Sequence, residues 1–88
     1  MPTVKEYSIH FREMLKERGI PEKWVKQVLA NPDIIENKDD GTTHYIKRIK
    51  EYDDRWLRVI INEDKIPAKI VTAFFDRRLR RKDHEDQG

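Results

Sequence analysis

Histidine, tyrosine and arginine residues occur in this sequence in a combination that could cleave RNA without a metal ion. Such cleavage needs a base for the 2′-hydroxyl, an acid for the leaving oxygen and cations that stabilise the charged transition state. The residues of suitable type are His10, His44, Tyr45, Arg58 and Arg77. The alternative is a solvated sheet face on which cations discourage edge aggregation, and for any single residue it is the simpler interpretation.

His10 and Arg18 are eight residues apart on one expected helix, with Met14 between them, so they share one side of it. A histidine near arginines could transfer a proton while the arginines hold phosphate. A structural histidine that caps or packs at the helix start is the other interpretation, and we favour it, because the spacing alone gives little support to a catalytic role.

A basic block follows the last apolar run, in the stretch FFDRRLRRK at residues 74–82. Residues 65–82 carry seven cations against Asp76 alone, a net charge of +6, whereas the whole chain has a net charge of only +2. Arginine matches phosphate bidentately, and an exposed phenylalanine can stack on a base. The expected binding residues are Arg18, Arg48, Phe74, Arg77, Arg78, Arg80, Arg81 and Lys82.

The partner of this block is either RNA or an acidic protein, and the sequence does not separate the two. The block could also pair with acidic segments of the chain itself or simply keep the domain in solution. A domain of this size buries only about 60% of its unfolded surface, so a homodimer is a further possibility.

Several classes of site and location are excluded or disfavoured. The chain has no cysteine, so it forms no disulfide and no thiolate-zinc site. Its three histidines are not spaced as metal ligands, and we expect no metal and no cofactor. The start lacks the apolar core of a signal peptide and no run reaches membrane-spanning length, which predicts a cytoplasmic protein with no membrane anchor.

The elements that would position these residues form one small domain. Of the 88 residues, 36% are hydrophobic and 41% are charged, which is typical of a folded domain with a highly charged surface. We expect the domain to span residues 1–82 and the acidic residues 83–88 to be a disordered tail. The first helix starts at Thr3, through a capping box with Glu6, or at Ser8, and it ends at Gly19.

A second helix follows Pro21 and stops at Asn31 and Pro32, where the apolar period changes from about 3.6 residues to two. Four strands joined by short loops come next, and short loops imply antiparallel neighbours. The sequence therefore predicts an α+β fold of order α-α-β-β-β-β, with both helices on one face of the sheet. The expected core residues are Trp24, Val28, Leu29, Leu57, Val59, Val71 and Ala73.

The stretches HFREMLKERGIPEKWVKQVLANPDII, RWLRVIIN and VTAFFDRRLRR together resemble the bacterial family called domain of unknown function 4258. The resemblance covers about residues 10–81, but Met14 stands where family members usually carry arginine. The family is similar to toxins of the RelE/ParE and BrnT type, which implies a RelE-like fold. The matching positions are His10, Arg18, Gly19, Arg58, Thr72, Asp76, Arg77 and Arg78.

Several toxins of that type are ribonucleases that cut messenger RNA. The resemblance therefore implies a toxin-like RNA-binding domain, with metal-independent endoribonuclease activity as an open question and an antitoxin as the neutralising partner. A non-catalytic protein-interaction module of the same fold is the alternative, and Met14 keeps it open.

Overall fold

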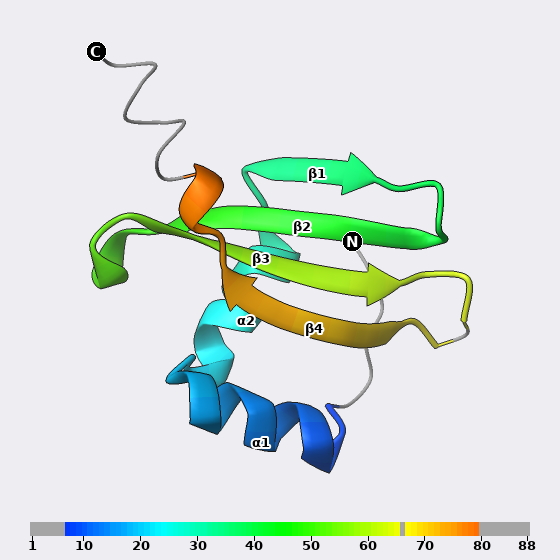
Figure 1. Ribbon diagram of the computed structural model, residues 1–88, viewed down its shortest axis with the longest axis horizontal. Coiled ribbons are helices and arrows are strands. Elements are labelled where there is room, and N and C mark those ends of the chain that lie inside the picture. The colour runs from blue at the N-terminus through cyan, green and yellow to red at the C-terminus, as the bar shows by residue number, and fades with distance from the viewer. Residues whose placement is uncertain (1–6, 66, 80–88) are drawn as a thin grey trace.

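The computed structural model describes residues 7–65 and 67–79, which form two helices and a four-stranded sheet (Figure 1). The helices and strands, with a short 3-10 helix η1, follow one another along the chain as α1 Ile9–Arg18, α2 Glu22–Ala30, β1 Ile34–Asn37, β2 Thr42–Ile49, η1 Lys50–Tyr52, β3 Arg55–Asn62 and β4 Lys69–Phe75. The sheet order is β1-β2-β3-β4, and each neighbouring pair is antiparallel. The predicted α+β fold is confirmed.

The helix boundaries follow from local capping. Ser8 accepts a hydrogen bond from the backbone N–H of Phe11 through its side chain, so α1 starts at the later of the two expected positions. Thr3 and Glu6 lie outside the described residues. Gly19 ends α1 in the left-handed conformation, at φ 67°, which glycine adopts without a Cβ penalty.

The core lies between the helices and one face of the sheet. Helix α2 packs on β2 and β3, and α1 packs on β4. Six of the seven expected core residues are buried there: Trp24, Val28, Leu29, Leu57, Val59 and Ala73. No helix among residues 7–65 and 67–79 is both long enough and apolar enough to cross a membrane.

Val71 is the seventh expected core residue, and that prediction is wrong because its side chain is 54% exposed. Ile60 pairs with Thr72 while Ile61 pairs with Ile70, so Val71 is an extra residue in β4. Such a bulge reverses the side-chain alternation on one side of it. Ile70 therefore packs against the core in place of Val71.

Neither α1 nor α2 packs on the other face of the sheet, which among the described residues carries only the short helical turn at residues 77–79 (Figure 1). Cross-strand partners share a face, so the pairing of His44 with Ile60 and Glu36, and of Arg58 with Ile46 and Phe74, assigns these side chains to it. We call this surface the helix-free face and define it by the polar and aromatic residues Glu36, His44, Arg48, Trp56, Arg58 and Phe74.

Candidate nucleic-acid interface

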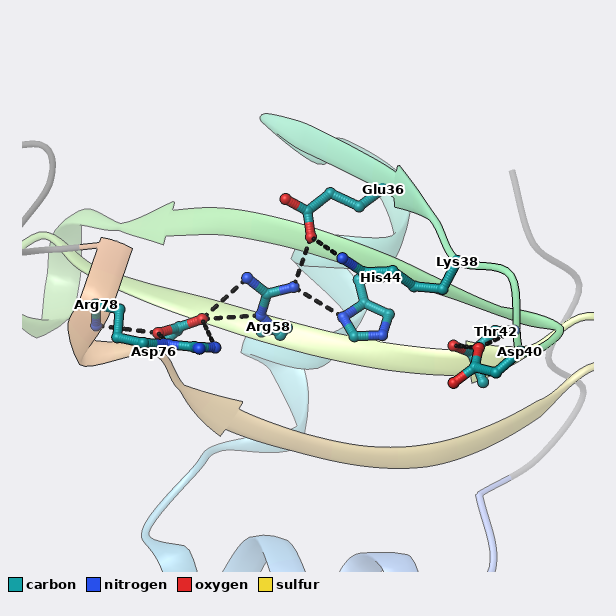
Figure 2. Close-up of polar contacts among 8 residues, drawn as sticks. All are labelled: Glu36, Lys38, Asp40, Thr42, His44, Arg58, Asp76 and Arg78. Atoms are coloured by element: carbon teal, nitrogen blue, oxygen red, sulfur yellow. Dashed lines mark hydrogen bonds and ion pairs between the residues drawn. The ribbon is translucent and has the colours of Figure 1, made fainter.

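Arg58 is the centre of a polar network on the helix-free face (Figure 2). It lies in the central strand β3 and is only 7% exposed. Its Nε and Nη2 lie 3.0 Å and 2.9 Å from Oδ2 of Asp76, and its Nη1 donates to Oε1 of Glu36 at 2.8 Å. A charge removed from water needs such compensation. Arg58 therefore has a structural partner on each side and is not free to bind phosphate.

Asp76 comes directly after β4 and is the most buried carboxylate of the network. Its backbone N–H donates to the carbonyl of Trp56 at 2.8 Å, which continues the β3–β4 pairing by one residue. Burial alone would raise the pKa of the Asp76 carboxyl group. Hydrogen bonds from Arg78 and Arg58 outweigh that effect, so the pKa is lowered and the group is ionised at neutral pH.

Arg78 is held by the same carboxylate but points into solvent. Its backbone N–H and Nε donate to Oδ1 of Asp76 at 3.0 Å and 3.3 Å, and Nη2 lies 3.4 Å from Oδ2. The side chain of Arg78 is nevertheless 84% exposed. Arg77 beside it is exposed and makes no hydrogen bond or ion pair with any other described residue. Arg78 thus combines accessible charge with a fixed attachment to the sheet, and Arg77 adds accessible charge beside it.

His44 contacts the network through one ring nitrogen. Its Nδ1 lies 2.8 Å from Nη1 of Arg58, and because a guanidinium only donates, Nδ1 must accept. The ring proton then resides on Nε2. Burial lowers the pKa of His44, and the positive charge of Arg58 lowers it further, so the ring is neutral at pH 7. In this arrangement His44 offers an N–H donor, while its basic lone pair is occupied.

Glu36 is the network residue that the sequence analysis did not identify. Its Oε1 also lies 3.2 Å from Nζ of Lys38, and hydrogen bonds from Arg58 and Lys38 lower the pKa of its carboxyl group. The signal that could have found it is the turn sequence around Asp40 and Gly41. A three-residue loop at 39–41, closed by the hydrogen bond from Lys38 to Thr42, pairs Glu36 with His44.

Arg48 and Trp56 form the second feature of the helix-free face. They are cross-strand partners, and the guanidinium carbon of Arg48 lies 5.4 Å from the centre of the Trp56 ring. This distance is typical of a cation–π contact. Phe74 is half-buried on β4, beside Arg58.

Tyr45 lies on the opposite side of the sheet from His44. It is buried among the core residues beneath the helices, and its hydroxyl donates to Oε1 of Glu63. Burial and the Glu63 hydrogen bond raise the pKa of the Tyr45 phenol to about 12. The structure therefore does not bring the two adjacent candidates for acid and base chemistry together.

The candidates on α1 do not join the Arg58 network. His10 is exposed and makes no hydrogen bond with another described residue. Arg18 donates through Nη1 to the hydroxyl of Thr72 at 3.1 Å and to the carbonyl of Ala73 at 2.7 Å, and the same hydroxyl lies 3.5 Å from Sδ of Met14. Arg18 thus attaches α1 to β4. Arg80, Arg81 and Lys82 lie outside the described residues.

Within residues 7–65 and 67–79, no three histidine, aspartate or glutamate side chains gather as metal ligands would. Searches of curated proteins and of solved structures found no match to the chain. One family model does match, and its match covers residues 7–75, more than half of the chain. That range includes both helices, all four strands and the network residues Glu36, His44 and Arg58. The chain belongs to the family described as Domain of unknown function (DUF4258).

Proposed function

We propose that this protein is a toxin-like RNA-binding domain that holds single-stranded RNA on its helix-free face. The observation that carries the proposal is the state of Arg78, which is largely exposed yet fixed by three contacts with the buried Asp76. An arginine held in this way loses little side-chain entropy when it binds phosphate. Arg77 adds a second accessible cation at the same place.

The neighbouring aromatic residues favour single-stranded RNA over a duplex. Unpaired bases stack on aromatic side chains and on guanidinium planes, whereas duplex bases are already stacked on one another. Trp56 with Arg48, and Phe74, supply such groups on the same face as His44. The Nε2–H of His44 adds a hydrogen-bond donor that remains uncharged at neutral pH.

The geometry favours binding over hydrolysis. The lone pair of His44 accepts from Arg58, Tyr45 is on the far side of the sheet, and His10 is on α1. Metal-independent cleavage would require Arg58 to release His44 and a second proton-transfer group to approach. The proposal includes a relationship to toxins of the RelE/ParE and BrnT type. It also includes an antitoxin whose acidic segment covers Arg77 and Arg78 and thereby neutralises the protein.

The test is a titration of fluorescently labelled single-stranded RNA at several salt concentrations. Replacing Arg77 and Arg78 with Gln should weaken binding and reduce the log–log salt slope by about 0.7 for each lost phosphate contact, or about 1.4 in total. The control variant is Arg12→Gln with Lys16→Gln, which removes the same charge from α1. Parallel incubations with and without EDTA, read on a gel, would detect cleavage.

Equal weakening in the two double variants would contradict the assignment to the helix-free face, because only general charge would then matter. A wild-type protein that binds no RNA would refute the proposed function. If such a protein instead bound an acidic polypeptide through Arg77 and Arg78, the protein-interaction alternative would replace it.

A further inference from the structure

The two edges of the sheet differ in how well they are protected (Figure 1). At the β4 edge, α1 packs against the strand and Arg18 donates to the carbonyl of Ala73. The bulge at Val71 also interrupts the regular strand there. A bulge and a covering helix are the features that prevent a second chain from adding to an edge.

Within residues 7–65 and 67–79, no helix packs against the β1 edge and no bulge interrupts Ile34–Asn37. β1 is an edge strand, and it lies beyond β2, on the side of the sheet away from α1. Ile35 is on the helix side, opposite Tyr45, and is nevertheless 55% exposed. An apolar side chain and an open row of backbone groups therefore occur together on this strand.

The hydrogen bonds of the β1–β2 hairpin show which backbone groups of β1 face outward. Lys38 donates its N–H to the carbonyl of Thr42, its cross-strand partner, at 2.9 Å. Antiparallel residues alternate between groups that point toward the partner and groups that point away. Ile34 and Glu36 consequently point their backbone groups toward β2, while Ile35 and Asn37 point theirs toward the open edge.

We propose that β1 pairs with β1 of a second copy of this chain, antiparallel, about a two-fold axis at Ile35. Ile35 then exchanges two backbone hydrogen bonds with Ile35 of the second copy, and their exposed side chains meet on the helix side. Asp33 stays outside this pairing, because its backbone N–H donates to the carbonyl of Ile46 and its Oδ2 accepts from the backbone N–H of Arg48. A symmetric dimer requires a patch that is complementary to itself in this way.

The neighbouring two-fold registers are less favourable. An axis at Glu36 places two carboxylates directly opposite each other. An axis at Ile34 places Ile35 opposite Asp33, whose backbone N–H already donates to the carbonyl of Ile46 and so does not face the second copy. Because β1 has only four residues, the interface is smaller than about 1,200 Å², and the association is weak and concentration-dependent.

The register can be tested by cross-linking the full chain, which contains no native cysteine. Residues in a hydrogen-bonded antiparallel pair have Cα atoms about 5.5 Å apart, within the range of about 4.4–6.8 Å that a disulfide spans. Ile35→Cys should therefore form a covalent dimer on mild oxidation. In Asn37→Cys the two cysteines would be about 13 Å apart, four residues along the strand, and should remain reduced.

A non-covalent test uses two apolar residues of equal exposure. Ile35→Lys should raise the dimer dissociation constant at least about tenfold, because it loses apolar burial and places like charges opposite each other. Val71→Lys, on the other edge, should leave it unchanged. Sedimentation between about 10 µM and about 1 mM measures both dissociation constants, and circular dichroism checks the fold.

Three results would each overturn the proposal. They are a wild type that is monomeric at every concentration, equal effects of the two lysine substitutions, and cross-linking in Asn37→Cys but not in Ile35→Cys.

Discussion

Replacing Asp76 with Ala tests whether the Arg58 network stabilises the fold. The substitution leaves the Arg58 guanidinium, which is 7% exposed, with Glu36 as its remaining anionic partner. Removing one member of a buried ion pair costs about 3–5 kcal/mol, because the other charge stays buried and uncompensated. A chain of 88 residues has a stability of only about 4–13 kcal/mol at about 0.05–0.15 kcal/mol per residue. We therefore expect Asp76→Ala to be marginally folded or unfolded.

The comparison with Glu36→Ala sharpens this prediction. The Glu36 side chain is 36% exposed, so its contact with Arg58 is screened by water and should contribute at most about 1 kcal/mol. Asp76→Asn should be no milder than Asp76→Ala, because it also removes the charge, and an amide oxygen that accepts from the backbone N–H of Arg78 leaves the NH2 group facing the donors of Arg58. It should therefore also lose about 3–5 kcal/mol.

Urea denaturation at pH 7, followed by circular dichroism, measures all three variants against the wild type. The double variant Arg58→Met with Asp76→Leu should recover most of the stability lost in Asp76→Ala, since no buried charge is then left without a partner. The reasoning is refuted if Asp76→Ala is no less stable than Glu36→Ala, or if the double variant is less stable than Asp76→Ala alone.

Two pH-dependent predictions follow from groups with perturbed pKa values. The pKa of His44 is lower in the folded chain than in the unfolded chain. As the pH falls below 6.5, the unfolded chain therefore binds a proton that the folded chain does not, and the free energy of unfolding decreases. His44→Gln should flatten that part of a urea-midpoint profile, and an unchanged profile would contradict the role of burial. The folded pKa of Tyr45 is raised to about 12, so its stabilising effect is complete below pH 10 and is lost as pH rises toward 12. Absorbance titration should show this late ionisation, and its amplitude should be smaller in Tyr45→Phe, where Tyr7, whose pKa is also raised by burial and by Glu22, still contributes; a wild type that ionises fully near pH 10 would contradict it.

The fold was predictable because its signals are local. Ser8, Gly19 and Asn31 mark helix ends, the Asp-Gly turn marks the first hairpin, and the apolar period changes after Pro32. Val71 was not predictable, because a bulge depends on how β4 pairs with β3 and leaves the composition of β4 unchanged. The assumption that side chains alternate strictly along β4 therefore assigned Ala73 to the correct face of the sheet and Val71 to the wrong face.

The candidate site was less predictable, because its chemistry depends on partners from other strands. Alternation alone separates His44 from Tyr45 once both are assigned to one strand. The burial of Arg58, however, requires Asp76 from the end of β4 and Glu36 from β1, and the sequence around Arg58 indicates neither. The occupied lone pair of His44 follows only from its contact with that arginine.

Asp76 connects the stability of the fold with the proposed binding surface. A substitution at Asp76 affects both, whereas a substitution at Arg78 should affect only the binding surface. Loss of Asp76 would release Arg58 inside the sheet and Arg78 at its surface. Loss of the Arg78 side chain would leave both contacts between Arg58 and Asp76 in place, because these use Nε and Nη2 of Arg58. Weaker RNA binding in an Asp76 variant therefore has two explanations, whereas weaker binding in an Arg78 variant of unchanged stability has one. The arginines at positions 77 and 78 are accordingly the residues that can test the binding surface separately from the fold.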